Sequence, residues 1–309
     1  MHTIFRIGNM IQSNDDNRLW QVDLIQTNDN DQQLNALTER IRNEIKGPTE
    51  WDRLAKLLIK LGQFDKADEL YEVLIDQTYN DREKTHFYHQ LGWSKKKQRK
   101  YAEALEYYQK ALEIKQRVMC PDHPSFAVSF NDIGSIYENM NEHIQALLYY
   151  EKGLDVQQEI LPPNYHGLTS SCSKIGSVYE KMGDYATALL FHEKAVEIHK
   201  KTLPVDKLNL AFSYNNIGSV YEKMGEYMKA LSSHEKALEI KKETLPPNHP
   251  DLAQSHSNIG FVYNKMCQYS KARQFHQYAV DIGQRSLPTN HPRLQQWKKN
   301  LGYVARKCN

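Results

Sequence analysis

A nine-residue word, IGSVYEKMG, occurs twice in this chain, at residues 175–183 and again at residues 217–225. Its glycine belongs to a column that recurs every 42 residues, and an alanine column follows the same interval. The glycines are Gly92, Gly134, Gly176, Gly218, Gly260 and Gly302, and the alanines are Ala104, Ala146, Ala188, Ala230 and Ala272. A fixed interval of this length indicates a stacked repeat architecture, in which each unit contacts mainly its neighbours.

Each repeat reads as two amphipathic helices joined by a tight turn. Residues 210–221 place apolar side chains at helical spacing, and residues 227–240 do so again after the turn. Gly183 and Gly225 stand where the first helix must end, because glycine tolerates the left-handed conformation of a helix C-terminus. In the linker that follows, Pro250 suits the first turn of the next helix.

This pattern resembles the tetratricopeptide repeat, and more narrowly the 42-residue type found in kinesin light chains. Three blocks carry the match: Ile-Gly-x-x-Tyr, Tyr-x-x-Ala-Leu, and the closing Lys-Ala-Leu-Glu-Ile at residues 110–114 and 236–240. The resemblance covers residues 51–309. It implies an all-α fold, a right-handed superhelix (an α-solenoid) of about six helical pairs plus a capping helix from residue 292 to about residue 307.

The chain departs from the resembled pattern at a few positions. Lys95 replaces the tyrosine of the first full repeat, and Arg99, Asn141 and Cys267 replace the turn glycine. In the first and shortest pair, Ala55 takes the place of the column glycine.

The first fifty residues differ from the repeats. Strands are predicted at residues 4–7 and 19–24, a turn at residues 13–17 and a helix at residues 29–45. A lone two-stranded hairpin is marginal in water. We therefore assign residues 1–47 to a small β-hairpin and helix remnant, and residues 48–309 to the repeat array.

The N-terminal segment is similar to the C-terminal end of an arginine-specific ADP-ribosyltransferase domain. Phe5-Arg6-Ile7 and residues 19–24 correspond to the last strands of that domain. On this alignment the family's catalytic Glu-x-Glu motif would precede Met1, so no catalytic or NAD-binding residue carries over to this sequence. The alternative is an N-terminal segment unrelated to that family.

The first helix of each pair is expected to line a concave groove that binds a peptide or protein partner. The candidates stand three and two residues before the column glycine, and one and five residues after it. They are Asn131, Ser173, Ser177, Lys181, Asn215, Asn216, Ser219, Lys223, Ser257, Asn258, Lys265 and Asn300. Asparagine amides can both donate to and accept from a peptide backbone. The family's peptide-binding repeats use asparagine at positions that Asn216, Asn258 and Asn300 match. The alternative is that these are solvated residues of a helix surface.

Composition and spacing argue against several other classes of function. The formal net charge of +2 gives no reason to expect nucleic acid as a partner, and no apolar run is long enough for a membrane span. The four cysteines form no Cys-x-x-Cys pair, so we expect reduced thiols, no metal and a cytoplasmic location. His192, His234 and His276 lie whole repeats apart, which predicts packing rather than convergence on a metal.

Three functions remain open from the sequence. The leading hypothesis is a non-enzymatic interaction scaffold that needs no cofactor. The second is the C-terminal fragment of an arginine-specific NAD(P)+ ADP-ribosyltransferase fused to repeats, with its catalytic residues missing. The third is a kinesin-light-chain-like cargo adaptor, although residues 29–45 are too short for the coiled coil that joins such chains to a heavy chain. Neither the partner nor the oligomeric state follows from the sequence.

Overall fold

The computed structural model describes residues 5–12, 20–26, 50–120, 123–160, 166–201 and 207–308. The chain divides into two compact units, Met1–Pro121 and Asp122–Asn309. Every helix among the described residues is too short or too polar to cross a membrane.

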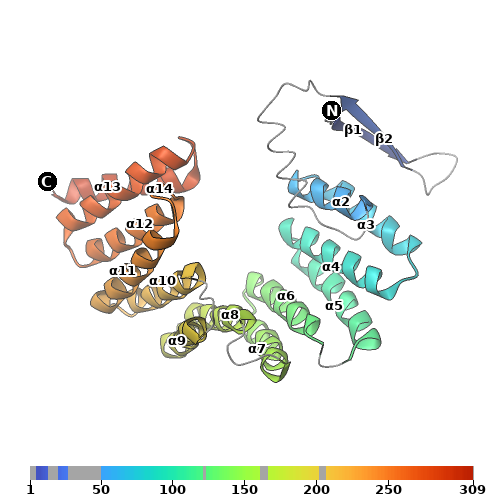
Figure 1. The fold of residues 1–309 in the computed structure, drawn as a ribbon, viewed down its shortest axis with the longest axis horizontal. Helices are drawn as coiled ribbons and strands as arrows, with labels where there is room; N and C mark the ends of the chain where they lie inside the picture. The colour runs from blue at the N-terminus through green and yellow to red at the C-terminus, as the bar shows by residue number, and fades with distance from the viewer. Residues whose placement is uncertain are drawn as a thin grey trace. The chain divides into compact units, whose positions relative to one another are not determined.

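Paired helices make up most of the described chain (Figure 1). The first unit contains α2 (Glu50–Lys60), α3 (Phe64–Gln77), α4 (Asp81–Lys97) and α5 (Tyr101–Val118). The second unit contains α6 (Ser125–Asn139), α7 (His143–Ile160), α8 (His166–Met182), α9 (Tyr185–Lys201), α10 (Lys207–Lys223), α11 (Tyr227–Thr244), α12 (Pro250–Lys265), α13 (Tyr269–Ser286) and α14 (Pro292–Cys308). These thirteen helices of the described residues form six pairs and one closing helix, so the predicted α-solenoid is confirmed.

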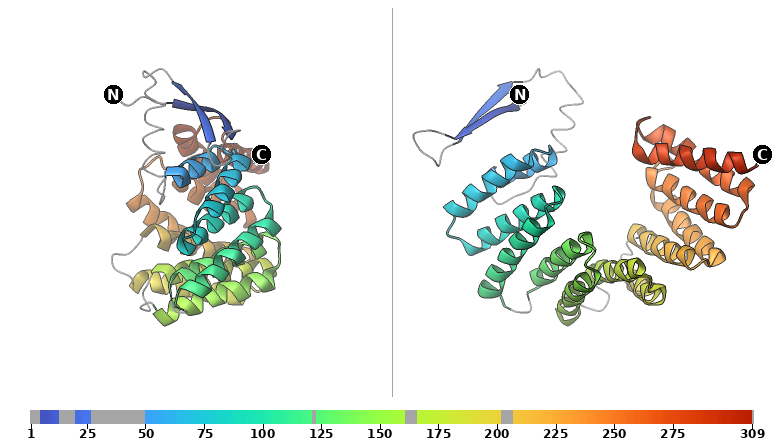
Figure 2. Two further views of the ribbon diagram at one scale, coloured as in Figure 1. Left: turned by 90° about the vertical axis from the view of Figure 1, so that its right-hand side faces the viewer. Right: turned by 180° about the vertical axis from the view of Figure 1, so that it is seen from behind.

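Within each unit, every helix packs on the helix before it and the helix after it. In the second unit the first helices of the pairs (α6, α8, α10, α12 and α14) form one layer, and the second helices (α7, α9, α11 and α13) form the other (Figure 2). We call the outer surfaces of these two layers the first-helix face and the second-helix face.

The N-terminal strands pair with each other. β1 (Phe5–Gln12) runs antiparallel to β2 (Trp20–Gln26), and an irregularity between Ile7 and Met10 shifts their register. Both strands extend beyond the residues that the sequence predicts. The predicted turn at residues 13–17 and the predicted helix at residues 29–45 lie outside the described residues. The domain boundary between residues 47 and 48 stays a prediction.

A close contact within each full pair joins the column glycine of the first helix to a ring of the second helix. A Cβ built on Gly218 would lie 2.6 Å from Cε1 of His234, and one built on Gly134 would lie 2.7 Å from Cδ1 of Tyr150. The same contact joins Gly92 to Tyr108, Gly176 to His192, and Gly260 to His276. Any side chain at these glycines would overlap the ring. The predicted packing role of the histidine column is confirmed, because all three histidines are buried in these contacts.

The turn within a pair keeps a left-handed residue even where the sequence lacks glycine. Gly62, Gly183 and Gly225 have φ of 75°, 84° and 76°, and Arg99, Asn141 and Cys267 have φ of 61°, 61° and 58°. Backbone bonds stabilise the turn, as where Gly225 N–H donates to Glu222 O at 3.1 Å and Glu226 N–H donates to Tyr221 O at 2.9 Å. They offset the cost of about 1–2 kcal/mol that this conformation imposes on a residue with a Cβ.

Successive pairs meet where the end of a second helix packs on the next first helix. Ser171 donates a hydrogen bond to Gln157 at 2.8 Å, and Lys241 donates one to Ser255 at 3.1 Å. The last of these joints is apolar. Gly283 stands in the column of Gln157 and Lys241, and a Cβ built on it would lie 2.7 Å from the ring of Trp297, which is 2% exposed. The closing helix α14 is thus held by a large buried ring.

We expect Gly218→Ala to lower the free energy of unfolding by about 1–3 kcal/mol, because the new methyl group overlaps the His234 ring. Gly302→Ala is the matched control, since a Cβ at Gly302 meets nothing within 4 Å among the described residues. That change should be neutral or stabilising by up to about 1 kcal/mol, because alanine favours a helix. Urea unfolding followed by circular dichroism measures both, and equal effects would contradict the packing assigned to the column.

Burial lowers the pKa of His234 to about 4, from the ordinary value of 6.5. Because the folded pKa lies below the unfolded one, the neutral ring contributes stability above about pH 6.5, which is lost as the pH falls towards about 4. When the pH is lowered from about 7.5 to about 5, the low pKa of His234 in the folded state should reduce the free energy of unfolding by about 2 kcal/mol. The change His234→Tyr gives Gly218 the same kind of ring that Tyr150 places on Gly134. It should abolish the contribution of His234 to the pH dependence of stability, measured by urea unfolding at the two pH values. A variant with the parent's pH dependence would show that the His234 ring is not the cause.

Candidate functional site

The first-helix face of the second unit is hollowed between α8 and α10. This α8–α10 hollow has a volume of about 450 Å³, and ten of its eleven lining residues have polar side chains. Its lining residues are Glu138, Thr169, Ser170, Ser173, Lys174, Ser177, His199, Asn209, Phe212, Ser213 and Asn216. Three residues that the sequence predicts for a ligand groove, Ser173, Ser177 and Asn216, are among them. The short hydroxyl side chains leave space that a longer chain would fill.

Phe212 gives the hollow an apolar surface. Its side chain is 48% exposed, and Nζ of Lys241 lies 5.0 Å from the centre of its ring. Lys241 is 2% exposed, and burial lowers its pKa. The contact between the ring and the buried cation keeps Phe212 in place. Sequence reasoning missed Phe212, although it stands four residues before Asn216 and therefore on the same stripe of α10.

The remaining predicted residues of this stripe lie outside the hollow. Ser219 and Lys223 follow on α10, Asn258 and Lys265 lie on α12, and Asn300 lies on α14. Gln254 donates to Oδ1 of Asn258 at 2.8 Å, and Gln296 donates to Oδ1 of Asn300 at 2.8 Å. These two amides therefore offer mainly their N–H groups, whereas the Asn216 side chain forms no hydrogen bond within the described part of the chain.

Four of the predicted residues stand three positions before a column glycine. Three of them, Asn131, Asn215 and Ser257, are bonded to neighbouring helices or buried, and so lie outside the hollow. Nδ2 of Asn131 donates to Ser171 at 3.2 Å, and Asn131 is 8% exposed. Oδ1 of Asn215 lies 3.1 Å from Nδ1 of His234, and Ser257 is buried. Ser173, the fourth, lines the hollow. Asn131 and Ser257 are buried and therefore offer a ligand less surface than the half-buried Asn216.

Two of the three predicted lysines, Lys181 and Lys223, form a ladder of ion pairs between neighbouring first helices. Nζ of Lys181 lies 2.7 Å from Oε1 of Glu138, and Nζ of Lys223 lies 3.0 Å from Oε1 of Glu180. Burial raises the pKa of Glu222, and the charge of Lys265 opposes that rise. Such exposed pairs stabilise a fold by at most about 1 kcal/mol each. Their main effect is to neutralise Lys181 and Lys223, so this face attracts acidic ligands less than its lysines alone would suggest.

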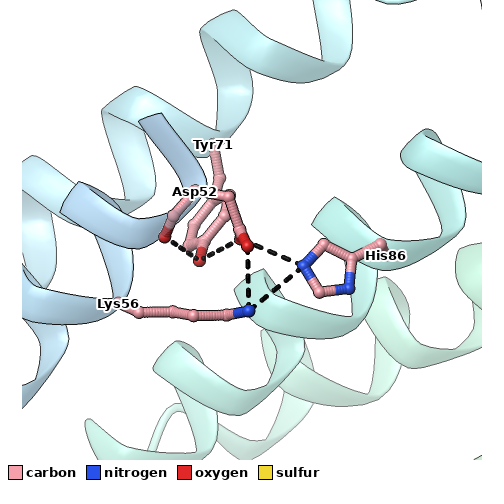
Figure 3. Close-up of polar contacts among 4 residues, drawn as sticks. All are labelled: Asp52, Lys56, Tyr71 and His86. Carbon is pink, nitrogen blue, oxygen red and sulfur yellow. Dashed lines mark hydrogen bonds and ion pairs between the residues drawn. The ribbon is translucent and has the colours of Figure 1, made fainter. Parts of the chain in front are cut away.

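A separate polar cluster lies in the first unit, where α2, α3 and α4 meet (Figure 3). Tyr71 OH donates to Oδ1 of Asp52 at 3.0 Å, Nε2 of His86 lies 3.0 Å from the same oxygen, and Lys56 donates to Oδ2 at 2.8 Å. Burial alone would raise the pKa of Asp52, but His86 and Lys56 hold it below its ordinary value. Both carboxylate oxygens are bonded within the cluster, so its role is to join three helices. No group of His, Cys, Asp and Glu that could hold a metal lies among the described residues.

The helical repeats of this chain match a known protein family. A family profile described as tetratricopeptide repeat matches residues 83–159, 168–243 and 209–285, and a second profile of that description matches residues 50–85. The chain belongs to the tetratricopeptide-repeat family. No curated protein matches the chain.

Solved structures share the tetratricopeptide-repeat fold of this chain at low sequence identity. The apo form of RapI is 19% identical over 88% of this chain and 80% of that chain, with a TM-score of 0.64. BtubC (BKLC) from P. vanneervenii is 18% identical over 79% of this chain and 95% of that chain, with a TM-score of 0.62. The nearly identical TPR-like repeats of a Podosopora anserina protein described as a kinesin light chain are 19% identical over 68% of this chain and 99% of that chain, with a TM-score of 0.58.

Membership of the tetratricopeptide-repeat family supports a scaffold for protein interactions. A scaffold of this fold is typically non-enzymatic. The hollow with its exposed ring, on the face of the first helices, fits that role because it offers both hydrogen-bonding groups and an apolar contact.

Proposed function

We propose that this chain is a non-enzymatic scaffold that binds a protein or peptide partner in the α8–α10 hollow and along the stripe of the first-helix face that continues from it. The hollow carries the proposal: it combines small hydroxyl side chains, the unbonded amide of Asn216 and the half-exposed ring of Phe212. A peptide that leaves water needs partners for its backbone groups and an apolar surface for its side chains. We expect the scaffold to act in the cytoplasm.

The stripe would extend the site by one amide in each further repeat. Asn258 and Asn300 have their oxygens held by glutamines one turn earlier, so their N–H groups are oriented for an acceptor on the partner. A net hydrogen bond contributes about 1 kcal/mol, so no single residue suffices. Affinity should therefore be about micromolar and should depend on several repeats together.

The double change Asn216→Ala with Asn258→Ala should weaken the binding of peptides selected from a random library by about tenfold or more, because it removes two amide partners. Ser232→Ala with Gln277→Ala, two exposed polar residues of second helices, is the matched control and should bind as the parent does. Fluorescence anisotropy measures the affinity, and circular dichroism verifies the fold. Equal affinities of the two double variants would exclude the proposed groove.

The N-terminal strands support a second proposal, that residues 1–47 are the end of an ADP-ribosyltransferase-like domain. β1 contains Phe5-Arg6-Ile7, β2 begins at Trp20, and the two strands are hydrogen-bonded neighbours, as consecutive strands of one sheet would be. In a protein of that kind, the repeats would direct the transferase domain to its targets.

This chain alone should transfer no ADP-ribose, because its sequence contains no Glu-x-Glu pair to carry the reaction. Incubation with NAD and agmatine, followed by mass spectrometry, should give no ADP-ribosyl-agmatine above a heat-denatured sample. Formation of the product at a rate proportional to protein concentration would show that catalytic residues lie elsewhere in this chain.

A further inference from the structure

The second-helix face of the second unit carries a groove of its own. This α11–α13 groove lies between those two helices, over α12, and has a volume of about 660 Å³. Three rings gather along it: the centre of the His256 ring lies 5.9 Å from that of Phe275 and 5.4 Å from that of Tyr278. Gln274 donates to Tyr278 OH at 3.0 Å, and the Tyr278 side chain remains 44% exposed. The groove therefore presents an aromatic surface to solvent.

The rim of this groove is acidic. Glu235, Glu239 and Glu243 line it from α11, and Lys242 is the positively charged lining residue. Glu243 pairs with Lys207 at 3.0 Å, whereas Glu235 and Glu239 have no ion-pair partner among the described residues. Burial lowers the pKa of His256 to about 4, so its ring is neutral at neutral pH. Nδ1 of His256 is buried with no hydrogen-bond partner in the described chain.

The residue at the position of Tyr278 differs from the residue at the same position of earlier repeats. In the four preceding repeats this position is lysine: Lys110, Lys152, Lys194 and Lys236. Three of these lysines place Nζ over an aromatic ring, Lys110 over Tyr107 at 5.4 Å, Lys152 over Tyr149 at 5.2 Å and Lys236 over Tyr214 at 5.7 Å. The repeat therefore normally supplies a cation to its own rings, and α13 supplies a further ring instead.

The neighbouring repeat gives the closest comparison. Tyr214 stands there in the place of His256, and the amino groups of both Lys200 and Lys236 lie over its ring, at 5.8 Å and 5.7 Å. In the α11–α13 groove, Tyr278 replaces the second of these lysines. Lys242 stands in the place of the first, and its charge adds to the effect of burial in lowering the pKa of His256, which is 8% exposed. The accessible groups of this groove therefore include the Tyr278 ring and the carboxylates of Glu235 and Glu239.

We propose that the α11–α13 groove is a second interaction site, which receives an arginine or lysine side chain of a protein partner on the exposed ring of Tyr278. The face of an aromatic ring attracts a cation, and carboxylates close by strengthen that attraction. Glu235 and Glu239 supply the negative charge. The site lies on the opposite layer from the α8–α10 hollow, so an experiment that excludes one of the two sites does not exclude the other.

A direct test is an NMR titration of the whole chain with a five-residue peptide that carries one arginine between leucines. The aromatic signals of Tyr278 and His256 should shift and saturate. The same peptide with citrulline, which keeps the shape of arginine without its charge, should bind at least about tenfold more weakly. Absence of a saturable shift, or equal affinity for the two peptides, would overturn the proposal.

Two variants of Tyr278 separate the role of the ring from that of the fold. Tyr278→Lys restores the residue of the four earlier repeats, and its amino group should occupy the rings and abolish binding of the arginine peptide. Tyr278→Phe keeps the ring and should bind within about twofold of the parent. Binding to Tyr278→Lys as tight as to the parent would refute the site.

Two further variants give independent readings. Glu235→Gln with Glu239→Gln retains the aromatic surface but removes the negative charge, so affinity should fall and should lose its dependence on salt. The variant Asn216→Ala with Asn258→Ala should leave arginine-peptide binding unchanged. If Asn216→Ala with Asn258→Ala lost binding while the Tyr278 and glutamate variants kept it, the peptide would bind the first-helix face, and the proposed α11–α13 site would be wrong.

Discussion

The contact between a bare glycine of one helix and a buried ring of its partner sets the geometry of every full repeat. The ring occupies the space in which a side chain of the first helix would otherwise lie, as His234 does over Gly218. The two helices can approach only if both residues keep their places, which explains why the ring stands at the same distance in sequence from its glycine in all five of these pairs. Tyrosine serves at Tyr108 and Tyr150 and histidine in the three repeats that follow, so the contact requires a flat ring rather than a particular polar group.

Because this contact fixes the pairs, the outer positions of the helices are free to differ between repeats. The first-helix face uses them for a ladder of lysine and glutamate pairs, and the second-helix face uses them for lysines that lie over aromatic rings. The candidate sites arise where single residues differ from those of neighbouring repeats. Phe212 stands where those repeats have Ser170 and Gln254 and gives one face an apolar surface, and Tyr278 removes a lysine from the other face. A repeat protein of this kind gains specific surfaces by single departures from its own pattern.

The sequence predicts the helices of the repeats, their pairing and the closing helix correctly, because helical periodicity and the glycine column are local signals. Its prediction of the groove is coarser. Asn131 and Asn216 stand one position apart relative to the glycine, yet Asn131 is buried against α8 and Asn216 faces the hollow. Lys181 reads as a free charge until its partner Glu138, a whole repeat away in sequence, is placed beside it. Such contacts depend on the stacking of neighbouring repeats, which a single repeat does not encode.

The joints between successive pairs are not equal. The joint of α11 with α12 buries the amino group of Lys241 against Ser255, and burial disfavours its charged form. The joint of α13 with α14 instead packs Trp297 on Gly283, with no charge to desolvate. The closing helix α14 packs mainly on one helix, α13, so its attachment to the array depends on this apolar joint. Removal of the Trp297 ring would therefore release the end of the array and expose the apolar side chains of α13 that it covers.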